Sequence, residues 1–270
     1  MVPLKMRVAV FSAWVTLAVA FAPLASRYSR HLSGSLGKAS WDFALSGAAV
    51  LALLTAVLAA FGAHAVVAAH PKARGGNLAH TAHYWATAAV LAATAVIGIP
   101  RIPTPALQVG GILVFGVLLG AVLALEHATV DAGERAYTLS RWALNALDYL
   151  IGLGVFAAAV TILSPGALGA SFAGLAAALL AVDVLRQPGR TPDSAALLVP
   201  AIGVLTGLAA ARILLWDIPP VRAALLLLLL LYALTGIFLH YLQRSLRWWV
   251  QVEYFALLLL GGWALLRWFP

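Results

Sequence analysis

The sequence predicts an all-α protein, a single bundle of eight or nine transmembrane helices without a soluble domain. Three observations lead to this prediction. Of the 270 residues, 63% are hydrophobic and 10% are charged, whereas soluble domains carry about 25% charged residues. Most of the chain consists of apolar stretches close to the roughly 20 residues that a bilayer-spanning helix needs. Runs such as 223–231 are continuously apolar, while the strands of a membrane barrel alternate polar with apolar residues.

Nine apolar segments can be assigned as spans in chain order. The first follows Lys5 and Arg7 and resembles a signal peptide. Because the sequence begins at Met1, we expect this segment to remain as a span. The predicted spans are residues 8–25, 41–69, 80–99, 105–126, 139–163, 167–186, 194–215, 221–242 and 247–268.

Helix ends and helix contacts both have sequence signals. Ser164 followed by Pro165 is typical of a helix start and precedes the sixth span. Glycines at four-residue spacing let membrane helices approach one another closely. We therefore expect helix–helix contacts at two pairs, Gly116 with Gly120 and Gly203 with Gly207.

The charge pattern predicts the membrane and the orientation. With the N-terminus in the cytoplasm, that side of the membrane holds ten lysines and arginines and the other side holds six, as the positive-inside rule requires. We expect a bacterial cytoplasmic membrane. The net charge of +8 is dispersed over short loops, so we expect membrane lipids as partners and no nucleic acid. The chain has no cysteine, which excludes a disulfide framework and a thiolate metal site.

Polar residues gather where the predicted spans meet the cytoplasmic side. Asp148 and Glu253 lie about two turns inside their spans, where a charge is costly and is retained for a structural or functional reason. We predict that they form an acid–base pair. A purely structural alternative is a set of ion pairs that fix helix register, with Arg141 beside Asp148 and Asp183 beside Arg186.

Further polar residues could orient the head group of a substrate. Arg141 and Asn145 share one face of the fifth span with Asp148, since they are spaced at i, i+4 and i+7. The predicted substrate-binding residues are Arg141, Asn145, His83, Tyr149 and His240.

A metal or haem site is a weaker hypothesis, and the sequence assigns no cofactor. His80 and His83 have the i, i+3 spacing of a chelating pair. No second histidine pair and no HExxH motif accompany them. The candidate ligands are His80, His83, His64, Glu126 and His127.

Three functions remain open at this point. The first is an intramembrane enzyme that acts on a lipid or an isoprenoid. The second is a non-catalytic accessory or assembly subunit, with other membrane subunits as partners. The third is a transporter of protons or small solutes, which requires polar residues beyond the membrane midplane; few follow in spans four, six and eight.

The second half of the chain resembles an uncharacterised family of bacterial polytopic membrane proteins, a domain of unknown function. The resemblance covers about residues 126–255 and implies no activity. It rests on Glu126-His127 with Asp131, on Arg141, Asn145 and Tyr149, on the run from His240 to Gln243, and on Val252-Glu253-Tyr254.

Overall fold

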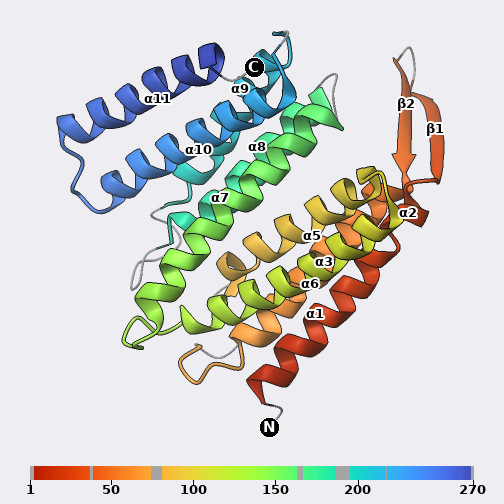
Figure 1. Ribbon diagram of the computed structural model, residues 1–270, viewed down its shortest axis with the longest axis horizontal. Coiled ribbons are helices and arrows are strands. Elements are labelled where there is room, and N and C mark those ends of the chain that lie inside the picture. The colour runs from red at the N-terminus through yellow and green to blue at the C-terminus, as the bar shows by residue number, and fades with distance from the viewer. Residues whose placement is uncertain are drawn as a thin grey trace. The chain divides into compact units, whose positions relative to one another are not determined.

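The computed structural model describes residues 3–36, 39–73, 81–162, 167–186, 195–216 and 218–268. These residues form helices and one two-stranded hairpin (Figure 1). The chain divides into two compact units, Met1–Val130 and Asp131–Pro270, here called unit 1 and unit 2. The prediction of an all-α polytopic bundle is confirmed.

Unit 1 packs α3 against α1, α5 and α6. Small side chains such as Ala59, Ala63 and Ala88 are fully buried along these contacts. Its elements are α1 (Leu4–Ala20), α2 (Ala22–Ala25), β1 (Ser29–Leu36), β2 (Ala39–Ser46), α3 (Gly47–Val67), the 3-10 turn η1 (Ala82–Tyr84), α5 (Ala86–Gly98), the 3-10 turn η2 (Ile99–Arg101) and α6 (Pro105–Ala128).

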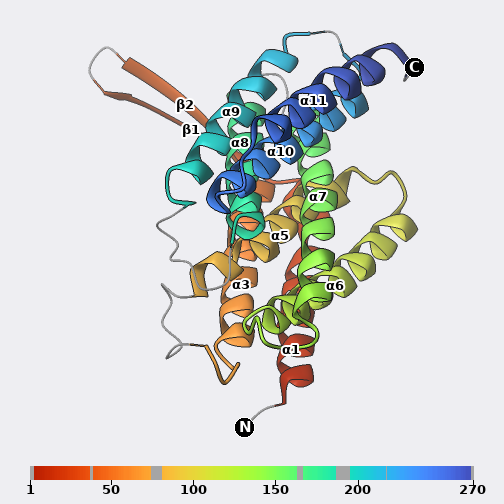
Figure 2. The ribbon, with the colours of Figure 1, turned by 90° about the vertical axis from the view of Figure 1, so that its left-hand side faces the viewer.

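Unit 2 consists of five helices. The pair α8 and α9 packs most closely, α7 contacts both α8 and α10, and α10 and α11 lie side by side (Figures 1 and 2). The helices are α7 (Tyr137–Thr161), α8 (Ala167–Val184), α9 (Leu198–Ile213), α10 (Pro220–Leu242) and α11 (Trp248–Trp268).

A described helix overlaps each of the nine predicted spans, with bounds that differ from the predicted ones. Among the described residues, seven helical segments are long and apolar enough to cross a membrane. The remaining two, Leu168–Val184 and Leu198–Ile213, are apolar but shorter. The chain is therefore an integral membrane protein with multiple spans.

The second predicted span was placed too early in the chain. It was expected from residue 41, but β1 and β2 form an antiparallel hairpin and α3 begins only at Gly47. Residues 40–45 alternate polar or small with apolar residues, a period that favours a strand. Ser46 then caps α3 by accepting a hydrogen bond from the Ala49 N–H at 3.1 Å.

The glycine pairs lie at close helix contacts, as predicted. A Cβ atom on Gly203 would lie 2.9 Å from the backbone oxygen of Gly174, so α9 rests directly on the backbone of α8. In unit 1, a Cβ atom on Gly116 would lie 2.7 Å from Oγ1 of Thr16 on α1. Gly203 needs to be glycine because a larger residue would push α8 and α9 apart.

Candidate functional site

The first half of α7 carries four polar residues on the face directed at α8 and α10. Arg141, Asn145, Asp148 and Tyr149 occur at helical spacing, as the sequence predicted. Asp148 is 1% exposed, and the other three side chains are half-buried. They lie toward the end of unit 2 where α7 and α11 begin and α8 and α10 end, here called the polar end of unit 2.

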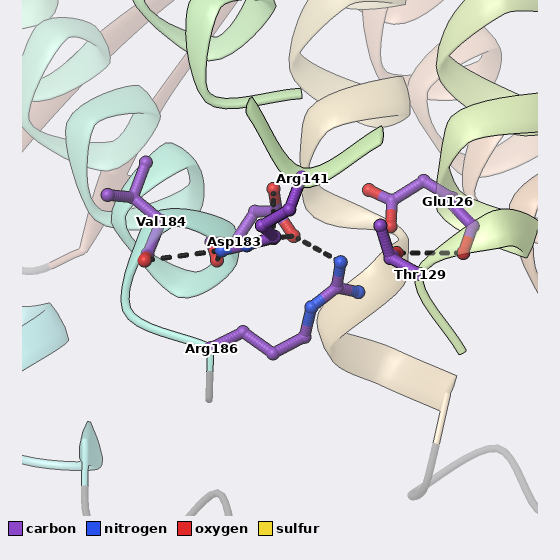
Figure 3. A network of polar contacts seen from close by, with 6 residues as sticks. All are labelled: Glu126, Thr129, Arg141, Asp183, Val184 and Arg186. Carbon is purple, nitrogen blue, oxygen red and sulfur yellow. Dashed lines mark hydrogen bonds and ion pairs between the residues drawn. The ribbon is translucent and has the colours of Figure 1, made fainter. Parts of the chain in front are cut away.

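The guanidinium group of Arg141 joins α7 to the end of α8 (Figure 3). Its Nη1 atom donates to both carboxylate oxygens of Asp183 at 3.1 Å. Its Nη2 atom donates to the backbone oxygens of Asp183 and Val184. Arg186 places Nη2 3.1 Å from the same carboxylate. Asp183 has no exposed surface, so two arginines rather than water compensate its charge.

These contacts make Arg141 a cap for the C-terminus of α8. The last carbonyl groups of an α-helix lack intrahelical donors, and hydrocarbon supplies none. The terminal nitrogens of Arg141 direct their hydrogen bonds at the carboxylate of Asp183 and at the last carbonyls of α8. The predicted pair of Asp183 with Arg186 is confirmed, and Asp183 is also the carboxylate that binds Arg141.

Asp148 extends this network from α7. Its carboxyl group interacts with that of Asp183. Both carboxyl groups are buried in the core of unit 2, and Arg141 and Arg186 pair with Asp183.

A line of aromatic side chains leads from Tyr149 across α10 to α11. The Tyr149 hydroxyl lies 3.0 Å from Oγ1 of Thr235, and its ring centroid is 5.5 Å from that of Tyr232. The ring of Tyr232 is 5.8 Å from that of Tyr254, which is 6.3 Å from the ring of His240. We call Tyr149, Tyr232, Tyr254 and His240 the aromatic line; its spacings are within or close to the range of interacting aromatic pairs.

Gly236 makes room for the tip of Tyr254. A Cβ atom on Gly236 would lie 2.3 Å from Cζ and 2.4 Å from the hydroxyl oxygen of Tyr254. Tyr232, Gly236 and His240 are four residues apart and therefore share one face of α10. The phenol of Tyr254 is thus seated on the backbone of α10, between the other two rings.

The end of α10 fixes the ring of His240. Arg244 has a φ angle of 54°, and the N–H of Ser245 donates to the backbone oxygen of His240 at 3.0 Å, which closes the helix. The hydroxyl of Ser245 lies 3.0 Å from Nδ1 of His240. The imidazole is therefore held against the turn, with Tyr254 as its aromatic neighbour.

Asn145 stands out because its amide oxygen is buried without a hydrogen-bond partner among the described residues. It lies between Asp148 and Arg141 on the polar face of α7. Further along the same helix, the leucine side chains of Leu180, Leu228 and Leu231 surround Gly152, since a Cβ atom there would lie 3.4 to 3.6 Å from them. This apolar layer separates the polar end of unit 2 from its other half.

Glu253 occupies a different environment from Asp148. It lies near the start of α11 on an exposed face, next in sequence to Tyr254. The aromatic line thus runs from the neighbour of Asp148 to the neighbour of Glu253. The structure does not bury these two carboxyl groups together: Asp148 is in the core of unit 2 and Glu253 is at its surface.

The other predicted residues that the structure describes belong to unit 1. Nδ1 of His64 lies 2.7 Å from Oγ1 of Thr81, and the ring of His83 stacks near that of Tyr84 at 4.3 Å. The rings of His70 and His127 are 4.8 Å apart.

The metal hypothesis gains no support from the described part of the chain. No group of three or more metal-ligating side chains assembles there, and His80 lies outside the described residues. Glu126, another predicted ligand, is completely buried, and its backbone oxygen accepts a hydrogen bond from the Thr129 hydroxyl at 2.9 Å (Figure 3).

Sequence analysis missed Tyr232 and Gly236. Both lie in the apolar helix α10, where an isolated tyrosine and an isolated glycine resemble packing residues. A signal was present, since Tyr232, Gly236 and His240 repeat every four residues. The role of Arg141 as a cap had no such signal, because it depends on where a separate helix ends.

The fold and the buried polar network define a polytopic α-helical membrane protein. The model of a protein family described as "Protein of unknown function (DUF5656)" matches residues 29–269. The chain belongs to this family. The predicted resemblance to an uncharacterised family is confirmed and extends beyond residues 126–255. No curated protein and no solved structure matches the chain.

Proposed function

We propose that the protein is an intramembrane enzyme that acts on a lipid or an isoprenoid at the cytoplasmic leaflet of a bacterial inner membrane. The polar head of the substrate would bind at the polar end of unit 2. The observation that carries this proposal is the aromatic line, which connects buried polar groups of α7 with the surface of α11. Polar groups inside a membrane are costly and mark functional sites.

Access from the membrane suits this arrangement. Tyr232 is 41% exposed, and the apolar residues Val252 and Phe255 around Tyr254 are more exposed still. An amphiphile could keep its tail in the lipid and present its head to the phenols. The leucine layer at Gly152 lies on the far side of the polar residues, which favours a one-sided site over a transport path.

The chemical roles follow from position. Asp148 and Glu253 are the acid–base candidates; they are next in sequence to Tyr149 and Tyr254 of the aromatic line, and His240 lies beside Tyr254. Proton transfer to or from the head group is the chemistry that carboxyl, phenol and imidazole groups perform. Asn145 and Tyr149 would orient the head group. Arg141 would act as a positioning residue, because its terminal donors hold Asp183 and the end of α8.

The test begins with gentle-detergent purification from native membranes and mass spectrometry of the retained lipids. The proposal predicts a retained lipid or isoprenoid in wild type and its loss in Tyr254→Phe. Tyr241→Phe is the matched control, because Tyr241 is exposed beside the line without belonging to it. Equal lipid retention in all three proteins would contradict the proposal.

An accessory or assembly subunit is the second candidate. The cap that Arg141 forms on α8 favours it, since this part of the polar network serves helix register. In that case the protein would be recovered only together with other membrane subunits. The substitution Asp148→Asn would then reduce co-purification of those subunits and leave lipid retention unchanged.

A further inference from the structure

We propose that the head group bound beside Asn145 is a hydrogen-bond donor, a hydroxyl or an ammonium group of an amphiphile, and not a phosphate or another anion. This inference rests on the proposed function and narrows its substrate class. It follows from counting which donors and acceptors at the polar end of unit 2 are already used.

The positive charges nearest the site are already bound. Arg141 directs its terminal nitrogens at Asp183 and at the end of α8, and Arg186 also binds the Asp183 carboxylate. An anionic head group would have to take these donors from a completely buried carboxylate. Such a carboxylate would then lose the partners that offset its desolvation.

The hydroxyl of Tyr149 is also committed as a donor. Oγ1 of Thr235 donates its one hydrogen to the backbone oxygen of Leu231 at 2.7 Å. Thr235 must therefore accept at its 3.0 Å contact with Tyr149, so the Tyr149 hydroxyl donates. The phenol oxygen of Tyr149 then remains as an acceptor for a further donor.

Asn145 adds a second acceptor on the same helix face. Its amide oxygen is buried and has no hydrogen-bond partner among the described residues. A buried polar atom without a partner costs about 1–3 kcal/mol, so a ligand that donates to it is favoured.

The probes are three amphiphiles that share a farnesyl tail and end in a hydroxyl, an ammonium or a phosphate group. Their binding to the purified full chain in lipid nanodiscs is measured by displacement of a fluorescent lipid. The inference predicts that farnesol and farnesylamine bind at least about tenfold more tightly than farnesyl phosphate, because one buried hydrogen bond corresponds to roughly this factor.

Substitutions at Asn145 test whether this residue causes the preference for the alcohol and the amine over the phosphate. Asn145→Leu should weaken farnesol and farnesylamine about tenfold, whereas Asn145→Asp should strengthen farnesylamine and weaken farnesyl phosphate. Gln251→Leu is the control, since it removes an exposed amide near the start of α11. Folding of each variant is checked by its thermal unfolding, and Asn145→Asp keeps the size of the side chain.

The outcomes separate the two proposals. Farnesyl phosphate binding as tightly as farnesol, and weakened by Asn145→Leu, would overturn the donor inference and leave the site in place. Binding of the alcohol and amine that does not change with Asn145 would also overturn it. Absence of binding by all three amphiphiles would contradict the proposed function itself. Ethanolamine, which has no tail, is expected not to compete. If it competed as strongly as farnesylamine, the site would bind a water-soluble amine, and the inference of a lipid ligand would be overturned.

Discussion

Units 1 and 2 place the same kinds of polar residue near helix ends but connect them differently. In unit 1, His64 on α3 lies against Thr81 and the ring of Trp85, and the ring of His70 lies against that of His127 on α6. In unit 2, contacts continue from Arg186 on the α8 side through α7 and α10 to α11. The comparison teaches that membrane depth and residue type alone do not mark a site. Unit 2 combines a buried carboxylate held by two arginines with a line of aromatic rings over three helices.

The largest expected effect is the loss of the cap on α8. Arg141→Leu should lower the free energy of unfolding by about 3–5 kcal/mol, because it leaves the buried Asp183 carboxylate with one arginine fewer. Unfolding in mixed micelles with increasing denaturing detergent measures this. The double substitution Arg141→Leu with Asp183→Leu should recover part of the loss, and a double variant as unstable as the single one would contradict the capping role.

Overpacking at Gly236 should have the next largest effect. Gly236→Ala places a Cβ atom against the phenol of Tyr254 and should destabilise by about 1–3 kcal/mol. Lipid retention should fall as well, because the aromatic line is displaced. The companion variant Gly236→Ala with Tyr254→Leu removes the clashing tip, so it should recover stability without recovering retention. If the double variant recovered both stability and lipid retention, the aromatic line would not be required for lipid binding.

A smaller effect is expected from Tyr149→Phe. The substitution removes the hydrogen bond to Thr235 and should cost about 0.5–1.5 kcal/mol of stability. It should also weaken farnesol binding, because the acceptor oxygen disappears. Thermal unfolding and lipid displacement measured on the same preparation separate these two effects; unchanged farnesol binding would remove Tyr149 from the site.

A substitution in unit 1 is expected to change stability alone, without any effect on lipid retention, and so tests the difference between the two units. Thr81→Val removes the partner of His64 and should cost about 0.5–1.5 kcal/mol, with lipid retention equal to that of wild type. A fall in retention as large as that of Tyr254→Phe would show that unit 1 also contributes to the site.

Much of the fold was predictable because span length and composition are local properties. Residues 109–125 form an apolar run that follows a proline at 105, and α6 spans it closely. The hairpin at residues 29–46 was missed because the apolar residues of 41–45 blend into those of α3. Their alternation, rather than their hydrophobicity, distinguishes a strand from a span.

The site was predictable only where it follows one helix. Spacing along α7 correctly grouped Arg141, Asn145 and Asp148 on one face. The partner of Arg141 depends on α8 ending beside α7, and the seating of Tyr254 depends on how α11 meets Gly236. Such contacts join residues far apart in the chain, so no spacing rule reveals them.

The most direct test of the central claim maps where a lipid head binds. The protein in nanodiscs is labelled with a photoreactive farnesol analogue, with and without excess farnesol, and the labelled peptides are identified by mass spectrometry. We expect the labelling that farnesol suppresses to fall on α7, α10 and α11 near Asn145 and Tyr254. Suppressible labelling confined to unit 1, or none at all, would contradict the assignment of a lipid site to unit 2.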